Sequence, residues 1–157
     1  MKLNVKSLAD VEIGFPVIAE GTYHAKIVSA EVKPNKTGDG NNLVVQFLVL
    51  DTEVLTHGKG LPIANKGQLK LTRYFSLKPT ADYDPDTAVK ELQVAIRKPA
   101  EEDLSSEELP NKIVMIKVAH KPAEKDPRTG KEYPEGNDIK RVTPVPEDDG
   151  FQPPPFA

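Results

Sequence analysis

Residues 68–77 read QLKLTRYFSL, and this stretch has the clearest β-strand pattern in the chain. Apolar and polar residues alternate along it, which is typical of a strand with one buried and one exposed face. The apolar positions are Leu69, Leu71, Phe75 and Leu77, and the polar positions are Lys70, Thr72, Tyr74 and Ser76. Arg73 is a charged residue in the apolar phase. We therefore predict a strand here, the third of five.

Two strands are predicted before this one. Residues 22–33 form a long strand whose apolar phase shifts by one position after Ile27, which predicts a β-bulge. Residues 43–50 form an almost continuous apolar run, as expected of a buried strand. Turn-forming residues fill 34–41 between the two strands, and 51–67 is predicted as a second, longer loop.

A helix and two strands are predicted after it. Asp84 followed by Pro85 is typical of a helix start, and apolar residues at helical spacing extend this helix over 85–98. Ser105, with a glutamate three residues later, predicts a further short capped turn. Residues 113–119 and 138–143 are predicted strands, joined by a charged loop over 121–136.

This order of elements predicts a mainly β protein with an OB-fold-like five-stranded Greek-key barrel and one helix between strands three and four. The predicted parts are a lead-in (1–20), the barrel domain (21–143) and a disordered acidic tail (144–157). In OB-folds, oligonucleotides bind across strands two and three, between the loop joining strands one and two and the loop joining strands four and five. Here those loops are 34–41 and 121–136.

Composition excludes several classes of protein. A chain of 157 residues fits one domain. Because it has no cysteine, disulfides and thiolate metal sites are excluded. No apolar leader and no run approaching ~18 apolar residues is present, so a soluble, intracellular, cytoplasmic protein is expected.

Charge is distributed unevenly along the chain. The net charge is −3, from 21 Lys and Arg against 24 Asp and Glu. Three acids stand together at 147–149, so the rest of the chain is neutral. A second acidic cluster comprises Glu101, Glu102, Asp103, Glu107 and Glu108. Outside these two segments basic residues exceed acidic ones, which allows a basic face and an anionic partner.

Motifs for catalysis are missing. The histidines His24, His57 and His120 are scattered, and none stands in a metal-binding spacing. Residues 58–60 (GKG) lack the other residues of a phosphate-binding loop, and 39–41 (DGN) lack the carboxylates of a calcium loop. Both are interpreted as turns. We predict no enzyme activity, no cofactor and no metal site.

Single-stranded DNA binding requires cations along a groove and aromatic rings on which bases stack. The exposed face of residues 68–77 offers Tyr74, although Tyr74 could instead be a half-buried strand aromatic and its lysine neighbours ordinary solvated charges. Tyr133 is a second stacking candidate, in a basic loop. The predicted DNA-binding residues are Lys33, Lys36, Lys70, Arg73, Tyr74, Lys125, Arg128, Lys131 and Tyr133.

Three segments, 21–23 (GTY), 36–43 (KTGDGNNL) and 137–140 (NDIK), resemble a family of small bacteriophage proteins that are often described only as domains of unknown function. The resemblance covers 21–143 and implies an OB-fold protein that coats single-stranded DNA during phage replication or recombination, in the host cytoplasm. The loop at 51–67 is longer than expected of that family. The alternative is a structural or assembly adaptor with an OB-like fold; the oligomeric state stays open.

The last residues, 147–157, read EDDGFQPPPFA, a segment too rich in proline to form a helix. Its two phenylalanine rings either dock on the domain itself or bind a partner protein. The segment resembles the acidic, phenylalanine-ended tails of bacterial and phage single-stranded DNA-binding proteins, which dock on replication and recombination proteins. That resemblance implies partner-binding roles for Asp148, Asp149, Phe151 and Phe156; a purely solubilising tail is the alternative.

Overall fold

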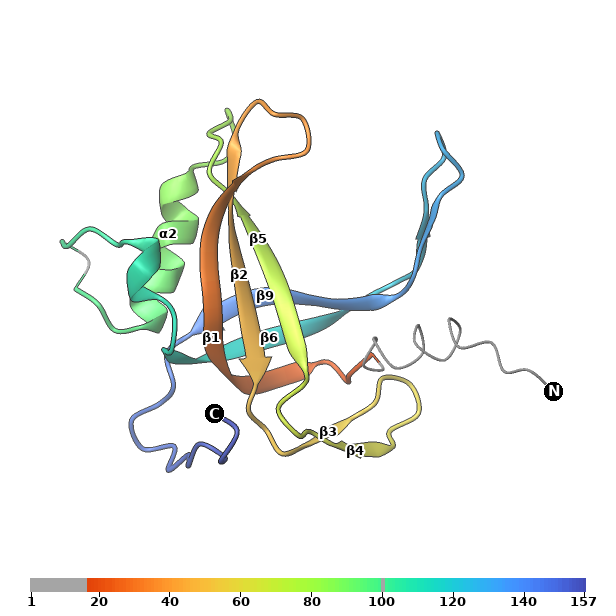
Figure 1. Cartoon of the computed structure of the whole chain (residues 1–157), viewed down its shortest axis with the longest axis vertical. Helices are drawn as coiled ribbons and strands as arrows, with labels where there is room; N and C mark the ends of the chain where they lie inside the picture. Colours follow the sequence, from red (N-terminus) through yellow and green to blue (C-terminus); the bar gives the residue numbers. More distant parts are fainter. Residues whose placement is uncertain (1–16, 100) are drawn as a thin grey trace.

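The computed structural model describes residues 17–99 and 101–157, and it is mainly β, as predicted. Five strands form one antiparallel sheet in the order β5-β2-β1-β6-β9. Their bounds are β1 Gly21–Pro34, β2 Asn41–Val49, β5 Lys70–Ser76, β6 Ile113–Lys121 and β9 Gly136–Thr143. Figure 1 shows β1, β2 and β5 along the long axis of the molecule, with β6 and β9 crossing them.

The register of the strands confirms the two sequence patterns that predicted them. The pairing of β1 with β2 shifts between Ile27 and Ser29, where the bulge was predicted. In β5, Phe75 is buried whereas Lys70 and Tyr74 on the other face are exposed. The apolar faces of both halves of the sheet meet in one core, whose fully buried members include Ile27, Phe47, Ile116 and Val142.

Helix α2 (Pro85–Ala95) follows β5 and starts where it was predicted. The Asp84 side chain caps it by accepting a hydrogen bond from the Asp86 amide, and proline occupies the first helical position. Its Leu92 is fully buried in the core. The helix was predicted to extend to 98 but ends at Ala95. Arg97 takes a positive φ of 59°, which is incompatible with a continuing helix. In the described part of the chain, no helix is both long and apolar enough to cross a membrane.

The five-stranded sheet is not closed into the predicted barrel. Its edge strands β5 and β9 approach one another, but within residues 17–99 and 101–157 no hydrogen-bonded ladder joins them. Instead, the Glu91 carboxylate of α2 accepts hydrogen bonds from Arg73 Nη1 of β5 (2.7 Å) and from the Val142 amide of β9 (2.7 Å). A side chain thus takes the place of strand pairing. We call these three residues the seam.

Both long predicted loops contain small antiparallel ladders. Residues 51–67 include β3 (Glu53–Leu55) paired with β4 (Pro62–Ala64), and 121–136 include β7 (Glu124–Lys125) paired with β8 (Glu132–Tyr133). Strands of two or three residues are too short to show an alternating pattern, so the sequence predicted loops. The capped turn is confirmed as the 3₁₀ helix η1 (Ser106–Glu108), with its capping box. The β7–β8 hairpin projects from the body as an arm (Figure 1).

Candidate functional site

The outer face of β1, β2 and β5 brings three of the predicted binding residues together. Tyr74 of β5 lies opposite Val44 of β2 and is 66% exposed. Together with Lys33 and Lys36 it lines a pocket of about 380 Å³. The other lining residues are Pro34, Asn35, Asn42 and Val44. This Tyr74 pocket therefore combines an exposed ring with two cations and two side-chain amides.

Two further charges lie on the same outer face. Lys70, four residues before Tyr74 in β5, is exposed and pairs in register with Leu48 of β2. Glu31 of β1 pairs in register with Val44 and forms an exposed ion pair with Lys33 (3.4 Å). Exposed pairs of this kind contribute little free energy. Lys33 can therefore exchange Glu31 for another anion at small cost.

The wall of the Tyr74 pocket is the loop between β1 and β2, which hydrogen bonds hold to the end of β5. The Asp39 carboxylate accepts hydrogen bonds from Lys78 Nζ, Thr37 Oγ1 and Asn35 Nδ2. These bonds, that from Lys78 most of all, hold the pKa of Asp39 well below its usual range. A Cβ on Gly40 would lie 2.9 Å from Lys78 Cβ, so only glycine allows this approach. Asp39 and Gly40 thus lie in the predicted loop, whereas Asn41 already begins β2.

Arg73 is not part of the Tyr74 pocket, although it precedes Tyr74 in the chain. Successive side chains of a strand point to opposite faces, so Arg73 points toward α2. There Nη1 and Nη2 lie 2.7 Å and 3.5 Å from the Glu91 carboxylate, and the guanidinium carbon lies 4.3 Å from the Phe75 ring centroid. The Arg73 guanidinium therefore binds Glu91 at the seam.

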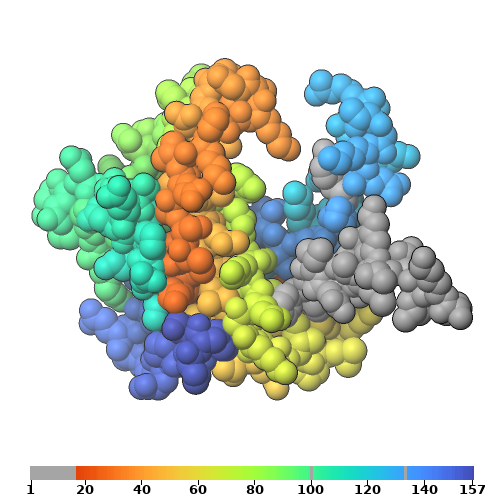
Figure 2. All heavy atoms as spheres, in the orientation of Figure 1, coloured from red at the N-terminus to blue at the C-terminus, as the bar shows by residue number. Residues whose placement is uncertain are grey.

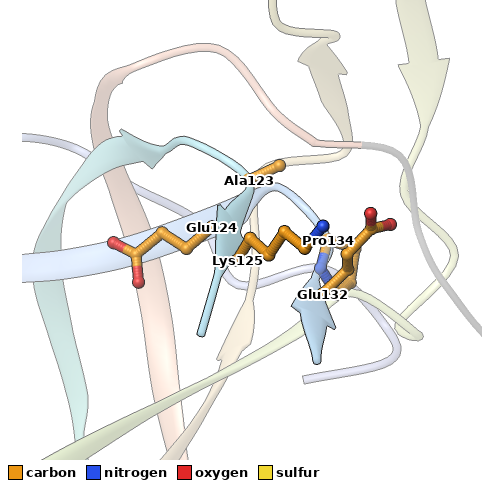
Figure 3. A pocket seen from close by; sticks show the side chains of 5 residues that line it. All are labelled: Ala123, Glu124, Lys125, Glu132 and Pro134. Atoms are coloured by element: carbon orange, nitrogen blue, oxygen red, sulfur yellow. The ribbon is translucent and has the colours of Figure 1, made fainter. Parts of the chain in front are cut away.

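The predicted cations of residues 121–136 lie on the arm, apart from the Tyr74 pocket. Figure 2 shows an open gap between the arm and the loop joining β1 and β2. Lys125 lies opposite Glu132 and lines a pocket of about 510 Å³ at the base of the arm. Figure 3 shows the Lys125 side chain extending toward Glu132 and Pro134, with Glu124 pointing the other way.

Hydrogen bonds of Asp126 shape the tip of the arm. The Asp126 amide donates to the Lys131 carbonyl (2.8 Å), and the Asp126 side chain accepts from the Arg128 amide (2.9 Å). Arg128 and Lys131 are therefore carried on a compact turn. The side chain of Tyr133 lies outside the part of the structure that is described, so its predicted role in stacking stays a prediction.

The acidic tail has no helix or strand, but it lies against the body, where the sequence predicted disorder. The Phe151 ring stacks on the His24 ring of β1 (3.8 Å between centroids, 9° between planes). Asp149 bonds to Nε2 of the same imidazole, whose Nδ1 faces Asp51 at 3.2 Å. The flat, partly exposed His24 ring therefore offers the tail a ring contact and a polar contact together.

Two further contacts hold the rest of the tail. Arg97 Nη2 donates to the Val145 carbonyl (2.7 Å), and Arg97 Nη1 lies 3.7 Å from Glu147 Oε1. Phe156 packs on Gly67, where an added Cβ would lie 2.8 Å from the ring. Asp148 is exposed. Both rings with predicted partner-binding roles thus contact the domain itself.

The other two histidines also stack, on each other. The rings of His57 and His120 lie 3.9 Å apart with an interplanar angle of 8°, and His120 Nε2 is 3.0 Å from Glu135 Oε2. Their stack joins the β3–β4 hairpin to the end of β6. Among residues 17–99 and 101–157, no three His, Asp or Glu side chains gather as a metal site would require.

Sequence reasoning missed the partners that position the site. Asn35, Thr37 and Asp39 stand at alternate positions of a turn-rich segment, a spacing at which such side chains bond locally. That signal could have identified Asp39 as a loop residue with a structural role. Lys78 and Glu91, which bind Asp39 and Arg73, carry no comparable signal, because their partners lie far away in the chain.

Comparison with known proteins identifies a family but no curated relative. No curated protein matches the chain. Residues 4–153, nearly the whole chain, match the family described as "Protein of unknown function (DUF669)", and the chain therefore belongs to that family.

Proposed function

We propose that the protein binds single-stranded DNA without sequence preference, on an OB-type fold, during phage DNA replication or recombination. The observation that carries the proposal is Tyr74, a largely exposed ring on the open face of the sheet, with Lys33 and Lys36 around the same pocket. Stacking rings and backbone-neutralising cations are the two elements that sequence-independent binding of single strands uses.

The strand order supports the OB-type fold. Counting only the five strands of the main sheet, the order is three-two-one-four-five, with the helix between strands three and four. In a Greek-key barrel of this type the third and fifth strands would lie together, and here they are the edge strands β5 and β9. Glu91 bridges them at the seam, which is consistent with a barrel left partly open.

Exposure of Tyr74 favours a binding role over the structural alternative. A strand tyrosine that only packs would be half-buried, whereas Tyr74 is 66% exposed. Base stacking on such a ring contributes about 1–3 kcal/mol per base. Lys70 on the same strand extends the positive charge beyond the pocket. The face therefore offers more than one contact to a single strand.

The tail is proposed to recruit replication or recombination proteins. Its Phe151 and Phe156 rings would then leave His24 and Gly67 to enter an apolar pocket of the partner, and its acids would meet basic residues around that pocket. The contacts with the domain compete with such an interaction. Breaking these contacts costs free energy, which the interaction of the tail with the partner must supply.

Fluorescence anisotropy with a labelled oligo-dT at two salt concentrations tests the proposal. We expect binding that weakens with salt, with a slope of about 0.7 per phosphate neutralised. Tyr74→Ala should cost about 1–3 kcal/mol with the slope nearly unchanged, because it removes a stacking surface and no charge. Tyr74→Phe is the matched control, since it keeps the ring, and it should bind like the wild type.

Two results would contradict the proposal. If the wild type binds no oligo-dT even at low salt, the adaptor alternative is favoured. If it binds but Tyr74→Ala binds equally well, DNA contacts another face of the protein. Circular dichroism of each variant separates loss of binding from loss of fold.

A further inference from the structure

We infer that Asp39 and Lys78 form a latch that positions the wall of the Tyr74 pocket for its ligand, and that neither side chain needs to contact that ligand. The inference rests on the proposed function, because it concerns the affinity of the same pocket for single-stranded DNA. Asp39 is negatively charged, as is single-stranded DNA, yet the inference gives Asp39 a role in promoting DNA binding. Asp39 and Lys78 are thus positioning residues.

The contacts of the latch tie the loop to a second strand. Lys78 follows β5, and its ammonium group bonds to the Asp39 carboxylate in the loop between β1 and β2. Both side chains are nearly half exposed, so this ion pair alone contributes little free energy. The backbone adds a second link at the same place, since the Leu77 amide donates to the Asn41 carbonyl at 2.8 Å. The absence of a Cβ on Gly40 lets the loop lie directly on the Lys78 stem. Side chain and backbone therefore fix the loop at the same place.

The latch determines where two pocket residues stand. Asn35 lines the pocket and donates through Nδ2 to Asp39 at 3.0 Å, while its amide donates to the Gly40 carbonyl at 2.9 Å. Lys36, the next residue, lines the pocket beside it. Without the carboxylate, Asn35 loses one of these bonds and Lys78 no longer anchors the loop. Binding would then have to order the loop, and that ordering costs affinity.

The direction in which DNA affinity changes when Asp39 is removed makes the inference testable. By charge alone, removing Asp39 should strengthen the binding of a polyanion, because it deletes a negative charge near Lys33 and Lys36. The latch predicts the opposite, since the loss of loop order outweighs the loss of one exposed charge. The two explanations therefore predict changes of affinity in opposite directions.

Oligo-dT anisotropy of Asp39→Ala, Lys78→Met and the double variant provides the measurement. We expect each single variant to bind roughly 3-fold to 10-fold more weakly, the range expected from ordering a side chain or loop on binding. The double variant should bind no more weakly than the singles, because both changes break one contact. Lys78→Arg keeps the ion pair and should restore most of the affinity.

A matched control is available on the same face. Glu31 is also an exposed acid, paired with a lysine that lines the pocket, but it does not anchor the loop. Glu31→Gln should therefore bind oligo-dT as tightly as the wild type or more tightly. Amide hydrogen exchange at Asn35 and Gly38, whose amides are bonded within the loop, should accelerate in Asp39→Ala and stay unchanged in Glu31→Gln.

The outcomes separate the latch from the proposed function. A wild type that binds no oligo-dT overturns the proposed function, and the positioning role with it. A wild type that binds, with Asp39→Ala equal to it or tighter, overturns the latch alone. Faster exchange at Asn35 and Gly38 with unchanged affinity also overturns the positioning role, because the loop would then lose order without any consequence for binding.

Discussion

The seam and the Tyr74 pocket lie back to back on one strand, and they use charge in opposite ways. At the seam, the Arg73 guanidinium donates two hydrogen bonds to Glu91 and lies over an aromatic ring. In the pocket, Lys33 pairs with the exposed Glu31, and the Tyr74 ring is open to solvent. Adjacent residues of β5 thus hold the seam on one face and line an open pocket on the other.

This difference shows that the face of a strand, more than the residue type, decides what a cation can do. The Arg73 and Glu91 side chains are about three-quarters buried, so removal of one would leave the charge of the other buried and unpaired. Lys70, three residues before Arg73, is on the solvent face and keeps its charge available. Mutations at the seam should therefore lower stability to urea, and mutations on the solvent face should weaken the binding of oligo-dT.

The largest expected effect is on stability, at the seam. Glu91→Ala leaves the Arg73 guanidinium and the Val142 amide without their acceptor, which should cost about 1–3 kcal/mol of unfolding free energy. Urea unfolding followed by circular dichroism measures this loss. Glu91→Gln keeps one acceptor oxygen and should lose less.

Tyr74→Ala is the matched variant on the other face. Because the ring is mostly exposed, its removal should leave the urea midpoint nearly unchanged. If Glu91→Ala unfolds at the wild-type midpoint, the seam does not join the edge strands. If Tyr74→Ala is the less stable of the two, the ring belongs to the core and the contrast between the faces fails.

A smaller effect concerns the salt dependence of oligo-dT affinity, which should differ between variants of Lys70 and Arg73. Lys70→Met should reduce the slope of log affinity for oligo-dT against log salt by about 0.7, because one phosphate contact is lost. Arg73→Met should leave that slope unchanged and lower the urea midpoint instead, since its partner is Glu91. Equal slope changes for both variants would place Arg73 in contact with DNA and contradict its assignment to the seam.

The sequence predicted those features of the fold that depend on local patterns. The alternation of residues 68–77, the phase shift after Ile27 and the capped start at Asp84 each determined one element correctly. Closure of the predicted barrel is not seen in the described sheet, where the Glu91 side chain, and no strand pairing, bridges β5 and β9. No local pattern reports that bridge.

The candidate site was predicted in part for the same reason. Period two placed Tyr74 on the solvent face and identified Arg73 as an exception in the apolar phase, but it could not reveal the acid that binds this arginine. Lys33 and Lys36 join Tyr74 only because the β1–β2 pairing brings the end of β1 next to β5 through β2. The cations of the arm are near one another in sequence, and the arm carries them away from the pocket.

The smallest expected effect concerns the tail, whose docking site at His24 is also on the outer side of β1. Deleting 147–157 removes three acids, of which Glu147 and Asp149 are held on the domain. The truncated protein should bind oligo-dT more tightly, by a factor of about two or three, and chiefly at low salt where screening is weak.

Phe151→Ala separates the ring from the charge in this effect. Ring stacking contributes about 0.5–1.5 kcal/mol, so the variant should release the tail and make it more sensitive to limited proteolysis. All three acids remain, and oligo-dT affinity should therefore stay below that of the truncated protein. Phe156→Ala, which removes the ring that packs on Gly67, should release the end of the tail and leave the His24 contact in place. Equal protease sensitivity in the wild type and Phe151→Ala would show that the His24 stack does not hold the tail.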